Sequence, residues 1–132
     1  MTEPQKVLES ARRILIVDWP SRDVPDTLAG AGYAIFMKGG AAVLALEPVD
    51  MVYVHRPLAE LEEIVATANS LGARAVWYQS GLTSTDVKDP KGCWLPEDAS
   101  RAARALVESA GMQYVDDVYI ADAVRRLRVM ER

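Results

Sequence analysis

The stretch Ile14-Leu15-Ile16-Val17 is a continuous apolar segment rich in β-branched residues. A strand that faces water on one side alternates apolar and polar residues, so an unbroken apolar segment is typical of a strand covered on both faces of a parallel sheet. Further segments of this kind follow at 33–37, 51–54 and 75–78, and a weaker one lies at 113–115. The sequence therefore predicts a parallel sheet of about five strands.

Helical stretches alternate with these strands. The clearest spans residues 57–71, where apolar residues recur at helical spacing, and segments 96–110 and 120–127 show the same pattern. A short helix at 4–13 precedes the first strand. Because strands that alternate with helices are joined by right-handed crossovers, helices cover both faces of the sheet. We expect a three-layer α/β fold with residues 1–132 forming one domain.

Two crossovers in this scheme are short. Residues 18–32 leave room only for a short helix that begins near Pro25. Residues 38–50 contain one apolar segment, 41–46, and the sequence is compatible there with one or two helical turns or with an extended segment.

Composition excludes several classes of protein. A length of 132 residues, with 50% hydrophobic and 26% charged residues, is typical of a soluble globular domain. The net charge of −4 argues against a partner bound by broad neutralisation of nucleic-acid phosphates. The single cysteine, Cys93, excludes a disulfide framework within the chain and is typical of a reducing compartment. With no signal-peptide pattern and no membrane-spanning apolar segment, we expect a cytoplasmic protein without a membrane partner.

The loops after the predicted strands form the expected ligand site, because ligands of an open parallel sheet bind at the carboxyl ends of its strands. Arginine and lysine side chains there offer positive charge, and glycine amides offer donors with no Cβ in the way, which together are typical of a phosphate site. The predicted site residues are Ser21 and Arg22 after the first strand, Lys38, Gly39 and Gly40 after the second, His55 and Arg56 after the third, and Gln79, Ser80 and Gly81 after the fourth.

The sequence gives little support for catalysis. His55 is the single histidine, and it has no second soft ligand at a usable spacing, so no metal site is predicted. Nothing in the sequence places Ser80 or Cys93 within reach of His55, and no nucleophile and base can be assigned. We therefore expect a non-catalytic binding domain.

The segment Trp77-Tyr78-Gln79-Ser80-Gly81 resembles a Trp-x-Gln-x-Gly segment of the small, single-domain CoA-binding proteins. Residues 7–17, 32–35, 49–57 and 110–117 resemble other segments of that family in the same order, so the resemblance spans nearly the whole chain. The fold of the family is Rossmann-like and similar to the CoA-binding domain of the succinyl-CoA synthetase alpha subunit. The resemblance implies that CoA or a related anionic nucleotide is the small-molecule ligand, bound at the carboxyl edge of the sheet.

The first loop departs from the pattern of the family. Members carry Gly-x-Ser after the first strand, but here Asp18 stands where the glycine is expected, and Trp19 and Pro20 follow it. Only Ser21 and Arg22 resemble the phosphate-binding turn. A carboxylate near a desolvated phosphate repels it by a few kcal/mol at an effective dielectric constant of about 20.

This departure leaves a second hypothesis open. A Rossmann-like domain without a cofactor would act as a protein-interaction or oligomeric subunit. Residues 82–95 form a longer strand-to-helix connection than usual, and long loops in compact domains are commonly functional. On this hypothesis the 82–95 loop contacts a second copy of the chain or a protein partner.

Overall fold

The computed structural model of the chain describes residues 3–39 and 47–130. Their strands pair in parallel in the order β2-β1-β3-β4-β5. The strands are β1 (Arg13–Val17), β2 (Ala34–Lys38), β3 (Met51–Val54), β4 (Ala75–Tyr78) and β5 (Gln113–Val115). The helices are α1 (Glu3–Ser10), α2 (Asp23–Gly30), α3 (Leu61–Ser70), α4 (Glu97–Ser109) and α5 (Ile120–Met130), and a short turn of 3₁₀ helix, η1 (Leu58–Glu60), leads into α3.

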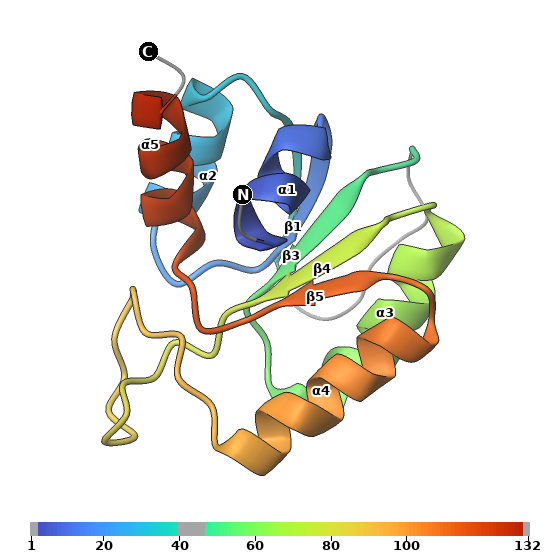
Figure 1. The fold of residues 1–132 in the computed structure, drawn as a ribbon, viewed down its shortest axis with the longest axis vertical. Coiled ribbons are helices and arrows are strands. Elements are labelled where there is room, and N and C mark those ends of the chain that lie inside the picture. Colours follow the sequence, from blue (N-terminus) through green and yellow to red (C-terminus); the bar gives the residue numbers. More distant parts are fainter. Residues whose placement is uncertain (1–2, 40–46, 131–132) are drawn as a thin grey trace.

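Helices cover both faces of this sheet (Figure 1). On one face α1, α2 and α5 pack together, and on the other α3 packs beside α4. The predicted α/β fold class, a three-layer Rossmann-like parallel sheet of five strands, is confirmed.

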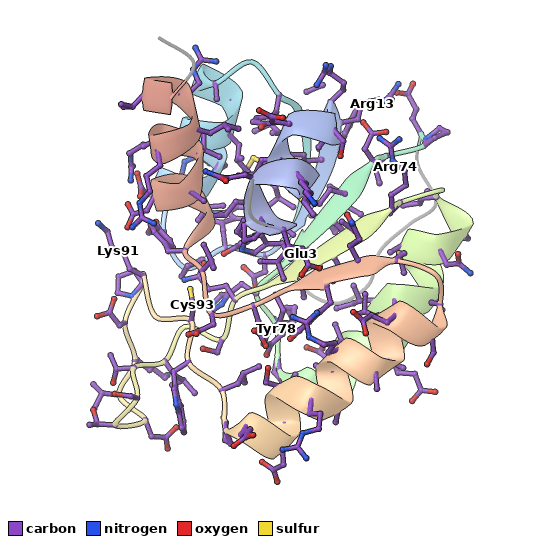
Figure 2. The ribbon with its side chains drawn as sticks, in the orientation of Figure 1. Glu3, Arg13, Arg74, Tyr78, Lys91 and Cys93 are labelled. Carbon is purple, nitrogen blue, oxygen red and sulfur yellow. The ribbon has the colours of Figure 1, made fainter. Side chains whose placement is uncertain are left out.

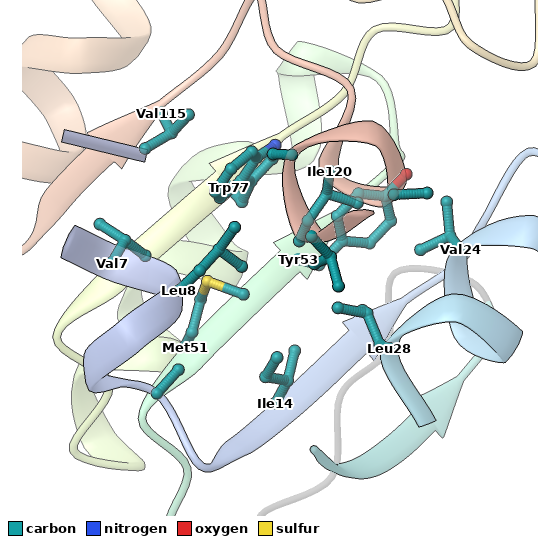
Figure 3. Close-up of a cluster of buried hydrophobic side chains, with 14 of the residues drawn as sticks. Val7, Leu8, Ile14, Val24, Leu28, Met51, Tyr53, Trp77, Val115 and Ile120 are labelled. Atoms are coloured by element: carbon teal, nitrogen blue, oxygen red, sulfur yellow. The ribbon is translucent and has the colours of Figure 1, made fainter. Parts of the chain in front are cut away.

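The central strands divide their side chains between two cores. Ile14 and Ile16 of β1 join the cluster under α1, α2 and α5, whereas Leu15 and Val17 join the cluster under α3 and α4. Trp77 of β4 is fully buried in the first cluster (Figure 3). Each such side chain contributes about 1.5–3 kcal/mol on burial, which explains why these strands are apolar without alternation.

The order of the strands reverses beside β1. The chain leaves β1 to form β2 on one side of it and then crosses back to form β3 on the other side. The loops after β1 and β3 therefore diverge and leave a crevice at the carboxyl edge, where open α/β sheets bind ligands. β1 and β3 end at the same level, because Val17 is paired with Val54 and the His55 N–H donates to the Val17 carbonyl at 3.0 Å.

The structure describes the first of the two short crossovers, residues 18–32, and only part of the second. The helix expected near Pro25 begins two residues earlier, at Asp23, and Pro25 lies in its first turn, where a missing N–H costs no hydrogen bond. The segment 41–46 lies outside the described residues. Within residues 3–39 and 47–130, no helix combines the length and apolar character that crossing a membrane requires.

A polar network ties α2 to α5. The Tyr119 hydroxyl donates to Oδ2 of Asp23 at 2.6 Å, and Arg125 pairs with Oδ1 of the same carboxylate. Thr27, one turn along α2, donates to Oδ1 at 3.2 Å. The Tyr119 hydroxyl lowers the pKa of Asp23, and Arg125 and Thr27 add to this effect against the opposing contribution of burial. The folded state therefore favours the ionised carboxylate.

Asp23→Asn should lower the free energy of unfolding by about 1 kcal/mol at neutral pH, because the donors around it lose a charged acceptor. The depressed pKa adds stability that is complete above the unfolded-state value and is lost as the pH falls through the folded-state value. In urea titrations between about pH 5 and about pH 3, the wild type should therefore lose more stability than Asp23→Asn. Asp26→Asn, at an exposed carboxylate on the same helix, is the control, and an equal loss in wild type and Asp23→Asn would contradict the assignment.

Candidate functional site

A cleft of about 640 Å³ opens at the crevice between the loops after β1 and β3. Its volume lies within the range of about 300–1,000 Å³ that is usual for small-molecule sites. The loop after β4 and residues from the 82–95 loop complete its walls. Most of the lining is apolar or aromatic, from Pro20, Pro57, Leu58, Tyr78, Leu82, Pro90 and Leu95, and its polar members are Asp18, His55, Arg56, Ser80, Lys88 and Asp89.

Arg56 lies between two carboxylates at this cleft. Its Nε and Nη2 donate to the two oxygens of Glu60 at 2.8 and 2.9 Å, and its Nη1 donates to Oδ2 of Asp18 at 3.1 Å. The hydrogen bond to Glu60, with that to Asp18, raises the pKa of Arg56 above its ordinary value. The guanidinium is therefore permanently charged, but its charge is compensated.

Asp18 is fixed by its backbone as well as by Arg56. Its φ of 61° lies in the left-handed region, which glycine enters at the least cost and which Asp tolerates better than most residues. Its N–H donates to the Lys38 carbonyl at 2.7 Å, and its Oδ1 accepts the N–H of Trp19 at 2.9 Å. The Trp19 indole packs against the first core cluster and is not part of the cleft wall.

Gln79 lies beneath the cleft and is 1% exposed. Its Oε1 accepts the Tyr53 hydroxyl, and its Nε2 donates to the carbonyls of Pro90 and Gly92 at 2.9 and 3.1 Å. Both amide hydrogens are used in this way. The side chain therefore holds the 82–95 loop against the end of β4.

Backbone contacts fix the 82–95 loop further. The Gly81 N–H donates to the Gly92 carbonyl at 2.9 Å, and the Trp94 N–H donates to the Leu82 carbonyl at 3.0 Å. A Cβ at Gly92 would lie 2.5 Å from the Leu82 oxygen, so the close approach requires glycine. The loop is thus a fixed wall of the cleft.

Cys93 lies on this loop, near Lys91 (Figure 2). Its Sγ donates to the Lys91 carbonyl at 3.4 Å. Burial, together with the nearby carboxylates of Asp117 and Asp116, raises the pKa of the thiol to about 12. Cys93 is therefore a protonated thiol near neutral pH, without the thiolate that nucleophilic chemistry requires.

His55 packs against Gly81 in the cleft wall. Its Nδ1 lies 3.0 Å from the Gln79 carbonyl oxygen, and because a carbonyl can only accept, Nδ1 carries the proton. In the neutral ring, Nε2 is then an acceptor. Gly81 has a φ of 76°, and a Cβ there would lie 2.5 Å from Cε1 of His55, so both its conformation and its contact with the ring require glycine.

Residues 17–121 match the sequence pattern of the CoA-binding domain family. The chain belongs to the CoA-binding domain family. Among curated proteins none matched the sequence. The match begins at the last residue of β1 and includes every loop that lines the cleft.

Solved structures share the fold of this family member. A hypothetical protein from Pyrococcus horikoshii OT3 is 20% identical with a TM-score of 0.70, and the alignment covers 97% of this chain and 93% of that one. Prb, a protein redesigned for binding, is 20% identical with a TM-score of 0.68 and the same coverages of 97% and 93%. A protein from Thermus thermophilus, cell-free ID.343, is 24% identical with a TM-score of 0.65, and the coverages are 96% and 99%. At these identities the likeness shows the fold alone.

The structure brings part of the predicted site together. His55, Arg56, Ser80 and Gly81 line the cleft, and Gln79 lies directly beneath it. Their roles as ligand contacts stay predictions.

Ser21, Arg22, Lys38 and Gly39, the other predicted residues that the structure describes, are not among those that line the cleft. Ser21 is hydrogen-bonded to Tyr119, and Arg22 pairs with Asp26 on the surface at 3.0 Å. Lys38 contacts the first loop through its carbonyl, and Gly39 is exposed. Gly40 lies outside the described residues, so the structure does not place it.

The far wall of the cleft is not among the site residues that the sequence predicted. Leu82, Lys88, Pro90 and Leu95 line it, together with Asp89. The unusual length of the 82–95 loop pointed to this segment, but loop length does not indicate which side chains face a ligand.

Gly81→Ala should destabilise the protein by about 2 kcal/mol or more, because it combines left-handed strain with a clash against His55. Thermal unfolding measures the loss. In a His55→Ala background, the cost of Gly81→Ala should fall toward the roughly 1 kcal/mol expected of backbone strain alone. An unchanged cost in that background would show that the ring contact does not matter.

Gln79→Ala should release the 82–95 loop, since it leaves the Pro90 and Gly92 carbonyls without their donor at a cost of about 1–3 kcal/mol. We expect trypsin to cleave at Lys88 or Lys91 in the variant well before it cleaves the wild type under native conditions. Gln113→Ala, at an exposed glutamine on β5, should leave the cleavage rate unchanged. Equal cleavage of wild type and Gln79→Ala would refute the anchoring role.

Proposed function

We propose that this chain binds CoA, or a related anionic nucleotide, in the cleft at the carboxyl edge of its sheet. The observation that carries the proposal is the position of the cleft. It opens where the order of the strands reverses, and the chain belongs to the CoA-binding domain family. Loops of the matched segment that are distant in sequence meet there, and it is the position where parallel sheets of this order bind ligands.

The cleft offers such a ligand hydrogen-bond donors as well as apolar walls. Arg56 has a fixed guanidinium with N–H groups beyond those it gives to Asp18 and Glu60. The Ser80 hydroxyl accepts the Leu82 N–H at 3.1 Å and keeps its own proton to donate. The apolar walls would exclude water around the ligand, which strengthens each polar contact.

We propose a binding role rather than a catalytic one. The single histidine uses Nδ1 on the Gln79 carbonyl, and Cys93 is protonated and is not among the cleft-lining residues. In the part of the chain that the structure describes, no group of three or more His, Cys, Asp or Glu residues could hold a metal ion.

Calorimetry with CoA tests the proposal. We expect saturable binding with one ligand per chain, and CoA at about a hundred times its Kd should add about 2.7 kcal/mol of stability. Arg56→Ala should weaken binding by about tenfold or more, since a hydrogen bond from a free N–H of the charged guanidinium to an acceptor on the ligand contributes about 1.5–3 kcal/mol. Arg101→Ala, an exposed arginine with a carboxylate partner on α4, is the matched control and should bind as the wild type does.

If CoA, acetyl-CoA, NAD and ATP all fail to bind, the proposal fails. The alternative of a domain without cofactor then gains support, and the compensated charge of Arg56 is the observation that favours it. Its contact surface would be the fixed 82–95 loop, where Val87 is 58% exposed. Sedimentation of the chain would then show whether the loop holds a second copy.

A further inference from the structure

The walls of the cleft carry no surplus of positive charge. Among the described residues that line it, Arg56 and Lys88 are offset by Asp18 and Asp89. Glu60 adds a second carboxylate to Arg56. Residues 40–46 contain no charged side chain, so they cannot change this balance. A ligand with several phosphates would therefore meet no net attraction inside the cleft.

Asp18 occupies the position at Arg56 that an anionic group would take. The carboxylate cannot swing away freely, because its other oxygen accepts the Trp19 N–H and its backbone is fixed on the Lys38 carbonyl. The second carboxylate, Glu60, binds Arg56 through two parallel hydrogen bonds. A phosphate that approached Arg56 would have to displace Asp18 or lie against it.

The rest of the cleft suits an uncharged chain with amide groups. His55 offers an acceptor at Nε2, and Ser80 offers a hydroxyl donor. Around them the wall is made by leucine, proline and tyrosine side chains. The Tyr78 hydroxyl is already committed, since it donates to the Arg56 carbonyl at 2.6 Å. A few polar groups among apolar walls are the pattern of a small-molecule site, and these two groups suit an uncharged ligand.

We propose that the cleft takes the pantetheine half of CoA, an uncharged chain with two amides and a thiol, and that Asp18 keeps phosphate away from Arg56. This inference rests on the proposed function and specifies which end of the ligand the cleft recognises. The nucleotide half then lies outside the cleft, where water and salt screen its charges.

Calorimetry with CoA, pantetheine and adenosine 3′,5′-bisphosphate tests this assignment. In the wild type, pantetheine should bind within about tenfold of CoA, and the bisphosphate should bind at least about a hundredfold more weakly than CoA. Asp18→Asn removes the charge and keeps a residue that tolerates the left-handed conformation. It should tighten binding of CoA and of the bisphosphate by about tenfold or more and change pantetheine binding less than about twofold.

Two further variants sharpen the comparison. Asp18→Gly relieves the backbone strain and gives the same ligand pattern if Asp18→Asn folds poorly. Asp89→Asn removes a carboxylate of the same cleft that is not paired with Arg56. Asp89→Asn should change the affinity for CoA less than Asp18→Asn does, because of these two carboxylates only Asp18 contacts the guanidinium of Arg56.

The outcomes separate this inference from the proposed function. If CoA and the bisphosphate bind the wild type equally well and pantetheine does not bind, CoA binding stands and the assignment of the pantetheine half is wrong. The assignment is also wrong if Asp18→Asn leaves CoA affinity unchanged. If neither CoA nor pantetheine binds the wild type or either Asp18 variant, the proposed function fails and the inference fails with it.

Discussion

The ion pair between Asp18 and Arg56 spans the point where the strand order of the sheet reverses. Asp18 follows β1 and Arg56 follows β3, so the pair joins the two loops that diverge to make the crevice. Partly exposed ion pairs of this kind contribute little to stability, about 0–1 kcal/mol. The pair between Asp18 and Arg56 matters more for the site, because it sets the charge of this part of the cleft wall.

On the opposite wall of the cleft, the buried amide of Gln79 holds the 82–95 loop in place. Gln79 satisfies two carbonyls of the 82–95 loop and the Tyr53 hydroxyl from a position that is 1% exposed. Leaving such groups unpaired in a core is costly, so the loop has one favoured position. The Trp-x-Gln-x-Gly segment is thus explained by structure: Trp77 fills the first core, Gln79 holds the loop and Gly81 makes room for His55.

The fold could be predicted from the sequence more fully than the site. Unbroken apolar strands such as Ile14–Val17 indicate burial on both faces of the sheet. This pattern can be recognised in a short stretch of sequence, and it predicts helices on both faces. The cleft depends instead on pairs distant in sequence, such as Arg56 with Asp18, and on which carbonyl Gln79 reaches. The spacing of apolar residues along the chain does not indicate which distant residues form such pairs. Arg22 illustrates the limit, because Asp26 in the first turn of α2 pairs with its guanidinium at the surface.

Position 18 combines a backbone conformation that favours glycine with a charged side chain. The loop adopts the left-handed conformation there, with φ of 61°, which glycine enters most readily and Asp tolerates better than most residues. The side chain adds a negative charge to this loop, because its carboxylate lies against the guanidinium of Arg56. At an effective dielectric constant of about 20, two unit charges about 4 Å apart interact by about 4 kcal/mol, which exceeds the about 1–3 kcal/mol of backbone strain at a single residue. The proposal that Asp18 keeps phosphate away from Arg56 therefore depends on electrostatics rather than on the shape of the loop.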